Sequence, residues 1–184
     1  MTRRLALVGL AVLLAACMTP RGTPDQQRTA IRDMRDDVLQ KLYAEKSSAR
    51  SEIANAPGYG VFSNANVNLI LASFAGGYGL IRDQTSGKET FMKMGEVGIG
   101  LGAGVKDYRV IFVFHDKDTL NDFVEKGWSF GGQADAAAKA SDQGAAAGAE
   151  AILDGVTVYQ MTESGLALQA TVKGTKYWKD DELN

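Results

Sequence analysis

Residues 127–131, Gly-Trp-Ser-Phe-Gly, match the GxSxG pattern that surrounds the nucleophilic serine of many hydrolases. That chemistry needs a strand, a sharp turn and a helix around the serine, and a histidine that can take its proton. Here the sequence predicts a helix before Ser129 and strand-like residues after it. The single histidine, His115, also precedes the serine, which reverses the hydrolase order Ser…Asp…His. We interpret the match as chance, identify no catalytic residue and expect no enzyme activity.

Other sites that need particular residue types are equally unsupported. The alternating glycines of residues 98–104 match neither GxGxxG nor the phosphate-binding loop GxxxxGK[ST]. Residues 115–118, His-Asp-Lys-Asp, could loosely hold a cation, but an aspartate that caps the following helix explains them better. One Cys and one His exclude multi-Cys and multi-His metal sites and an intramolecular disulfide. We therefore predict neither a metal nor a cofactor.

Composition narrows the class of protein further. The 184 residues are 45% hydrophobic and 23% charged, which is typical of a globular domain and not of a disordered chain. Twenty basic and 22 acidic residues give a net charge of -2. A protein that binds nucleic acid needs a basic surface that displaces phosphate counterions. Because the net charge is slightly negative, we expect no nucleic-acid partner.

The first 23 residues are typical of a bacterial lipoprotein. Arg3 and Arg4 precede an apolar run at 5–16, too short to span a bilayer, and the run ends in a lipobox-like Leu-Ala-Ala before Cys17. We predict a signal peptide at 1–16 and a lipidated tether at 17–23, the alternative being a plain secretory signal with an incidental cysteine. Acyl chains on Cys17 would anchor the protein in a membrane. Met18, where inner-membrane lipoproteins carry Asp, favours the outer membrane with the domain facing the periplasm; exposure at the cell surface stays open.

Residues 24–184 are expected to form one domain that opens with a long helix at 24–46. Thr23, Pro24 and Gln26 form a helix-start signature, and apolar residues follow at helical spacing. A second stripe on another face holds three arginines, and aspartates interleave with them. A solvated, salt-bridged face is the simpler interpretation, and binding of lipid headgroups is the alternative. The arginines are Arg28, Arg32 and Arg35.

Residues 57–184 have the pattern of strands connected by turns. We expect strands at 58–63, 69–74, 78–83, 89–94, 108–114, 155–161 and 166–172, with a hairpin turn at 84–87. A short helix is expected at 118–126, ended by Gly127, and a loop at 134–151. The glycines at 98–104 leave one strand face bare, which suits a helix or an aromatic ring packed flat on it, the alternative being a ligand.

The last residues combine lysines with aromatic rings. Such a combination favours a membrane interface, although the acidic residues 180–182 weaken it. Lysines that keep an edge strand soluble are the alternative. The candidate headgroup contacts here are Lys173, Lys176 and Lys179, with Trp178 as the interfacial ring.

From about residue 53 onward the chain carries a series of short segments: 54–64 (ANAPGYGVFSN), the Gly-rich turn 76–79, the glycine strand 98–105, the apolar strand 110–114, 130–136 (FGGQADA), 164–166, 174–175, Asp180 and Asn184. With these segments the chain resembles the SYLF domain family, found in eukaryotic endocytic adaptors and in bacterial lipoproteins. The resemblance rests on the order of short segments more than on any single one. Ser63 stands where the family usually has Pro, and the Lys usual after Asn64 is absent.

The resemblance implies phosphoinositide binding through an N-terminal amphipathic helix and basic residues, and actin bundling. Only lipid binding could apply in a bacterial periplasm, where such actin filaments are absent. We expect an α+β fold: a twisted antiparallel sheet, curled toward a barrel or sandwich, with the long N-terminal helix packed on it. We expect a non-enzymatic envelope lipoprotein that binds anionic phospholipid headgroups. The alternative is a protein–protein adaptor or structural module of the envelope.

Overall fold

A computed structural model describes residues 20–69, 72–98, 105–129, 150–153, 155–162, 165–166 and 175–184. Several sequence predictions lie outside these ranges: the signal peptide, Cys17, the alternating glycines after Gly98, the loop up to residue 149 and Lys173. Within the described ranges no helix is both long enough and apolar enough to cross a bilayer.

Helix α2 (Pro24–Glu45) begins where the capping signature predicts. The Thr23 hydroxyl accepts a hydrogen bond from the Gln26 backbone N–H at 3.4 Å, and the Gln26 side-chain oxygen accepts one from the Thr23 N–H at 2.9 Å. This reciprocal pair satisfies two N–H groups that a helix start leaves without partners. The predicted apolar stripe is confirmed by the buried side chains of α2, which are Ile31, Val38, Leu39 and Leu42.

Helix α3 (Ser48–Asn55), which the sequence analysis did not predict, follows directly. Its Ala49 and Ile53 are buried in one apolar cluster with residues of α2 and of the sheet. The helix has no side-chain cap at its start, and only two of its eight residues are buried, so its sequence carried little signal.

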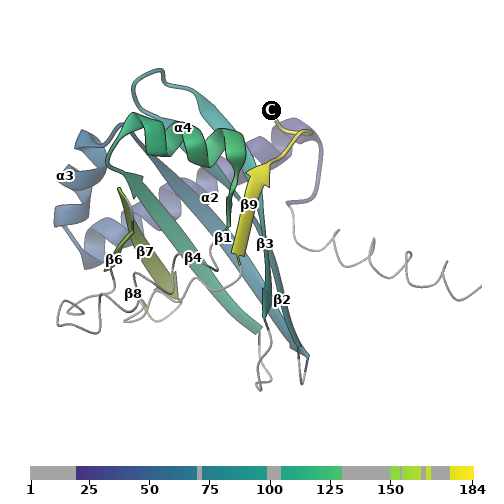
Figure 1. Ribbon diagram of the computed structural model, residues 1–184. Helices are drawn as coiled ribbons and strands as arrows, with labels where there is room; N and C mark the ends of the chain where they lie inside the picture. The colour runs from purple at the N-terminus through teal and green to yellow at the C-terminus, as the bar shows by residue number, and fades with distance from the viewer. Residues whose placement is uncertain are drawn as a thin grey trace, which may run out of the picture.

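Nine strands of the described ranges form one antiparallel sheet in the order β5-β9-β3-β2-β1-β4-β7-β6, with β8 paired to β7 (Figure 1). The predicted α+β class is therefore confirmed. The strands are β1 (Gly58–Leu69), β2 (Ala72–Asp83), β3 (Glu89–Gly98), β4 (Val105–Phe114), β5 (Trp128–Ser129), β6 (Glu150–Leu153), β7 (Val156–Thr162), β8 (Gly165–Leu166) and β9 (Thr175–Lys179).

Two strand predictions were wrong. The predicted strands 69–74 and 78–83 are not separate, because β2 runs unbroken and the predicted Gly-rich turn at 76–79 lies in its middle. A Cβ atom at Gly77 would lie 2.1 Å from the Ser63 carbonyl oxygen, so that glycine allows close strand packing and makes no turn. Strand β9, which the sequence analysis did not predict, pairs with β3 on one side and β5 on the other, so its lysines do not serve an edge strand.

The sheet buries both faces. Val61 and Ile111 pack in the cluster that α2 and α3 cover, whereas their neighbours Phe62 and Phe112 pack in the cluster that α4 (Lys117–Lys126) covers. In Figure 1 α4 lies in front of the sheet and α2 behind it. Strand β4 is buried on both faces, as its apolar run predicted.

The sheet is strongly curled around the face that α4 covers. Strands β1 and β9 are separated by β2 and β3, which would place them about 14 Å apart in a flat sheet. Yet the rings of Phe62 and Tyr177 have centroids only 4.8 Å apart. The end strands β5 and β6 do not pair with each other in the described ranges, so the sheet is curled but not closed into a barrel.

The curl predicts that Gly79 tolerates no side chain. A Cβ there would lie 2.2 Å from the Val61 carbonyl oxygen and 2.5 Å from Cδ1 of Phe62. We expect Gly79→Ala to lower the free energy of unfolding by about 1–3 kcal/mol, measured by urea denaturation. Gly95→Ala is the control, because its nearest contact is the partly exposed Trp178 ring at 3.1 Å, which can shift. Equal losses in the two variants would contradict this account of the curl.

Candidate functional site

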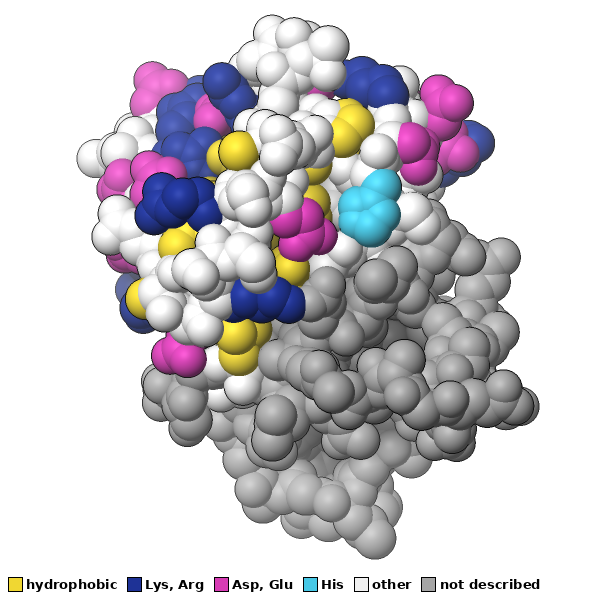
Figure 2. Space-filling view, turned by 90° about the vertical axis from the view of Figure 1, so that its left-hand side faces the viewer, with side chains coloured by type: hydrophobic (Ala, Val, Ile, Leu, Met, Phe, Trp, Pro, Cys, Tyr) yellow, Lys and Arg dark blue, Asp and Glu magenta, His cyan; other side chains and the backbone are white. Residues whose placement is uncertain are grey.

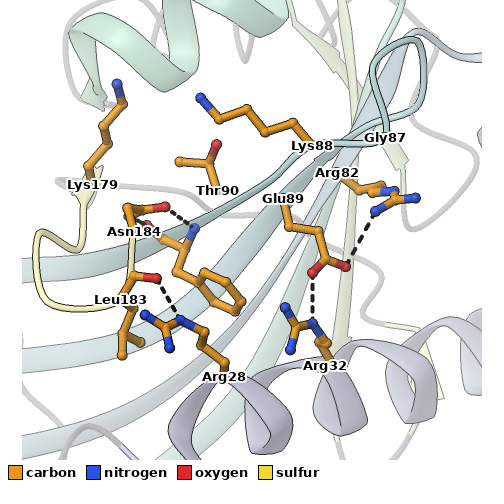
Figure 3. Close-up of a pocket in the computed structure, with 11 residues that line it drawn as sticks. Arg28, Arg32, Arg82, Gly87, Lys88, Glu89, Thr90, Lys179, Leu183 and Asn184 are labelled. Atoms are coloured by element: carbon orange, nitrogen blue, oxygen red, sulfur yellow. Dashed lines mark hydrogen bonds and ion pairs between the residues drawn. The ribbon is translucent and has the colours of Figure 1, made fainter. Parts of the chain in front are cut away.

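A cavity of about 470 Å³ lies where the first half of α2, the β2–β3 hairpin and the C-terminal residues meet (Figure 3). Five cationic side chains and one carboxylate line it, together with Gly87, Thr90, Phe91, Leu183 and Asn184. An excess of cations around one hollow suits an anionic ligand. The charged residues are Arg28, Arg32, Arg82, Lys88, Lys179 and Glu89.

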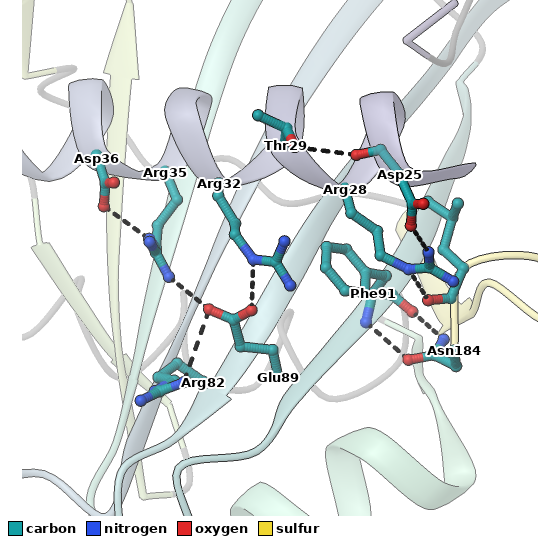
Figure 4. Close-up of polar contacts among 11 residues, drawn as sticks. Asp25, Arg28, Thr29, Arg32, Arg35, Asp36, Arg82, Glu89, Phe91 and Asn184 are labelled. Atoms are coloured by element: carbon teal, nitrogen blue, oxygen red, sulfur yellow. Dashed lines mark hydrogen bonds and ion pairs between the residues drawn. The ribbon is translucent and has the colours of Figure 1, made fainter. Parts of the chain in front are cut away.

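Glu89, the first residue of β3, holds three guanidinium groups together (Figure 4). Its carboxylate lies 2.7 Å from Nε of Arg32, 2.8 Å from Nη1 of Arg35 and 3.7 Å from Nη1 of Arg82. Burial alone would raise the pKa of Glu89, but hydrogen bonds and charge from Arg32 and then Arg35 outweigh burial and lower it. The carboxylate therefore stays ionised and ties α2 to the β2–β3 hairpin.

The remaining wall is formed by the C-terminal residues. Arg28 donates from Nε to the Leu183 carbonyl oxygen at 2.9 Å and from Nη1 to Asp25 at 2.6 Å. Asn184 accepts from the Phe91 N–H at 3.0 Å and donates to the Phe91 carbonyl oxygen at 2.7 Å. This amide continues the pairing of β3 beyond the end of β9, and so fixes the C-terminal residues beside α2.

Lys88 and Lys179 bring positive charge from the side of β3 that faces α4. Lys179 lies 2.9 Å from Glu125 of α4, and this hydrogen bond lowers the pKa of the Glu125 carboxyl. Lys88 is exposed and forms no ion pair within 4.0 Å in the part of the chain that the structure describes. Figure 3 shows both lysines on the same side of the cavity, with the Thr90 hydroxyl between them.

The structure brings some of the predicted headgroup contacts together and separates others. Arg28, Arg32 and Lys179 line the cavity, and Arg35 reaches it through Glu89. The interpretation of the arginine stripe as a solvated face was incomplete, because its arginines also bond to the sheet and to the C-terminal residues.

Strand β9 carries two more of the predicted contacts, outside the cavity. Lys176 is exposed, and Trp178 is 40% exposed with its ring over Gly95. Two further predicted residues, Lys173 and Cys17, lie outside the described ranges.

Sequence reasoning missed Arg82 and Lys88. They flank the predicted hairpin turn, so the turn itself could have indicated that the two side chains lie at the same end of the sheet. Nothing local in the sequence indicated that α2 lies beside this hairpin.

The motifs that the sequence analysis rejected have structural explanations. Ser129 lies in β5, directly after α4, and not in a turn between a strand and a helix. His115 Nε2 lies 2.7 Å from the Thr157 hydroxyl, and Figure 2 shows the imidazole at the surface among charged side chains of both signs. Asp116 caps α4 by accepting from the Thr119 N–H at 2.7 Å. In the described ranges no three Asp, Glu, His or Cys side chains are grouped so that they could hold a metal ion.

Comparison with known proteins identifies a family model and a relative that match this chain. A family model described as "Ysc84: Las17-binding protein actin regulator" matches residues 95–184. Beta cell expansion factor A of Aeromonas veronii is 34% identical over 167 residues, which cover 88% of this chain and 60% of that protein. The chain belongs to the SYLF domain family.

SYLF domains are known as lipid-binding or actin-regulator domains and are not known as enzymes. The stretch matched by the family model contributes only Lys179 among the five cations of the cavity. The other four come from α2 and from the β2–β3 hairpin, which precede it. Membership of the SYLF family therefore does not by itself imply this cavity.

The bonds of Glu89 predict an acid-sensitive contribution to stability. Glu89→Gln should lower the free energy of unfolding at pH 7 by about 1–3 kcal/mol, because three guanidinium groups lose a charged partner. The folded protein lowers the pKa of Glu89 from its ordinary 4.5, so its contribution is complete above that value and is lost as pH falls through the lower folded pKa.

Urea denaturation at pH 7 and pH 3 measures both effects. The unmodified chain should lose more stability on acidification than Glu89→Gln does. Glu45→Gln, a change at an exposed carboxylate on α2, is the control and should behave like the unmodified chain. Equal acid losses in Glu89→Gln and the unmodified chain would rule out a stabilising role for this network.

Proposed function

We propose that this chain is a lipid-anchored envelope protein whose SYLF domain binds anionic phospholipid headgroups in the cationic cavity, without catalysing a reaction. The observation that supports it is the gathering of five cationic side chains, from three separate parts of the chain, around one cavity. Its volume of about 470 Å³ lies in the range of small-molecule sites, roughly 300–1,000 Å³. A phosphate group accepts hydrogen bonds from guanidinium and ammonium groups alike.

Four of the five cations of the cavity remain available to a ligand, whereas Arg32 is held by Glu89. Lys88 has no ion pair among the described residues, and the contact of Arg82 with Glu89 is long at 3.7 Å. The pairs Arg28–Asp25 and Lys179–Glu125 are exposed on their acidic side, where ion pairs contribute only about 0–1 kcal/mol. A phosphate can therefore compete for these groups at small cost.

The proposed anchor would hold the cavity near a membrane surface. Cys17 is seven residues before Pro24, and an extended tether of that length reaches at most about 25 Å. Arg28, one turn into α2, lines the cavity. We place the anchor in the bacterial outer membrane with the domain facing the periplasm. In this proposal Lys173, Lys176 and Trp178 provide further contacts with the headgroup region.

Vesicle flotation tests the proposed binding with the chain that starts at Pro20, which retains every described residue and lacks Cys17. We expect flotation with vesicles that contain phosphatidylglycerol, none with phosphatidylcholine alone, and weaker binding as salt rises. Arg82→Gln with Lys88→Gln should reduce affinity about 10- to 30-fold, because each cation near an anionic surface contributes about 1 kcal/mol.

Lys41→Gln with Lys126→Gln removes the same charge from exposed positions outside the cavity, and this matched control should bind nearly as the unmodified chain does. Equal losses in the two double variants would refute a specific role for the cavity. If the chain floats with no vesicle, the lipid anchor serves only as a tether, and an envelope protein becomes the partner to search for.

The anchor itself is tested in bacteria that express the chain with residues 1–19. The protein should incorporate labelled palmitate and fractionate with membranes, and Cys17→Ser should abolish both. Density separation of the envelope then assigns the inner or the outer membrane. Equal palmitate incorporation in Cys17→Ser would disprove lipidation at this residue.

A further inference from the structure

Helix α2 separates its charges between two sides. Arg28, Arg32 and Arg35 are only partly exposed and bond to the sheet, to the C-terminal residues or to neighbouring acids. The side of the helix that faces away from the sheet is open to solvent and carries the exposed carboxylates Asp33 and Asp37. Asp25 and Asp36 lie at its border, where they pair with Arg28 and Arg35. The Asp25 side chain is 93% exposed and that of Asp36 is 56% exposed. We call the side that carries Asp33 and Asp37 the outer face of α2.

The apolar residues of α2 are not available to a membrane in this fold. Ile31 is 1% exposed, Val38 4% and Leu42 0%, because all three pack against the sheet or α3. The helix is amphipathic, as the sequence predicted, but its apolar side is already occupied. An approach by the free side of the helix would bring aspartates to the bilayer.

The β2–β3 hairpin presents the opposite charge. Residues 84–88 are exposed, and Arg82 and Lys88 line the cavity directly beside the turn. The turn is held in place: Gln84 donates from Nε2 to the Ile53 carbonyl oxygen at 2.6 Å and to the Ala56 carbonyl oxygen at 2.9 Å. This end of the domain is therefore a fixed, cationic surface.

We infer that the domain docks on an anionic bilayer with the cavity and the β2–β3 turn toward the headgroups and with the outer face of α2 turned to water. The inference rests on the proposed function and adds to it an orientation. An anionic surface attracts the cations around the cavity and repels the aspartates of the outer face within about a Debye length, roughly 8 Å at physiological salt. The docked helix stays packed on its sheet and does not insert.

Single-cysteine labelling tests the orientation. The chain that starts at Pro20 has no cysteine, because Cys17 is the only one in the sequence. Thr85→Cys places an environment-sensitive fluorophore in the β2–β3 turn. Ala30→Cys places it on the outer face of α2, at the same end of the helix as Arg28. Both positions are exposed, and both substitutions leave the net charge unchanged.

With phosphatidylglycerol vesicles, the label at residue 85 should shift to the blue, brighten at least threefold and be quenched by nitroxide-labelled headgroups. The label at residue 30 should keep its spectrum in water. A response at residue 30 equal to or greater than that at residue 85, or no response at either position while the protein floats, overturns the orientation and leaves headgroup binding intact. Absence of flotation overturns both.

Neutralising the outer face gives an independent readout. Asp33→Asn with Asp37→Asn should change the affinity for these vesicles less than threefold at physiological salt, because both carboxylates point to water. An increase of tenfold or more would show that the outer face lies against the bilayer and would refute the proposed orientation. Thermal unfolding of the variant checks that the fold is retained, since neither carboxylate has a described ion pair.

Discussion

The ion pairs of Glu89 hold the arginine side of α2 against the β2–β3 hairpin. Arg32 and Arg35 lie on one side of the helix, and the carboxylate at the start of β3 binds both while it also contacts Arg82 from the neighbouring strand. A partly buried carboxylate is costly without partners, so these bonds stabilise the orientation that the buried Ile31, Val38 and Leu42 also favour. The aspartates of α2 are then left on the outside, and the cationic cavity forms between helix, hairpin and C-terminal residues.

Local signals were sufficient for much of the fold. The capping box at Thr23 located the start of α2, Asp116 and Gly127 bounded α4, and the apolar run of β4 indicated burial on both faces. The curl of the sheet was also expected, and the ring contact between Phe62 and Tyr177 confirms it. For the start of α2, the bounds of α4 and the burial of β4, the signal came from a few neighbouring residues.

The errors arose where partners distant in sequence decide the outcome. Gly77 suggested a turn, but the neighbouring strand comes so close that only a glycine fits there. The arginine stripe of α2 suggested a solvated face, because the sequence shows aspartates directly beside these arginines. Their partner in the sheet, Glu89, lies 57 residues beyond Arg32 and could not be recognised from the sequence. Arg82 and Lys88 were missed for the same reason, since only the packing of α2 beside the hairpin makes them part of a cavity.

The carboxylate inside the cavity also affects which form of phosphate can bind there. Glu89 already neutralises part of the positive charge, so any phosphate competes with a permanent intramolecular anion. A free phosphate competes at its bulk concentration. A headgroup in the membrane that holds an acylated Cys17 would be presented by a short tether at an effective concentration in the millimolar range. A cavity that binds soluble anions weakly would thus be filled more readily once the protein is anchored at a membrane.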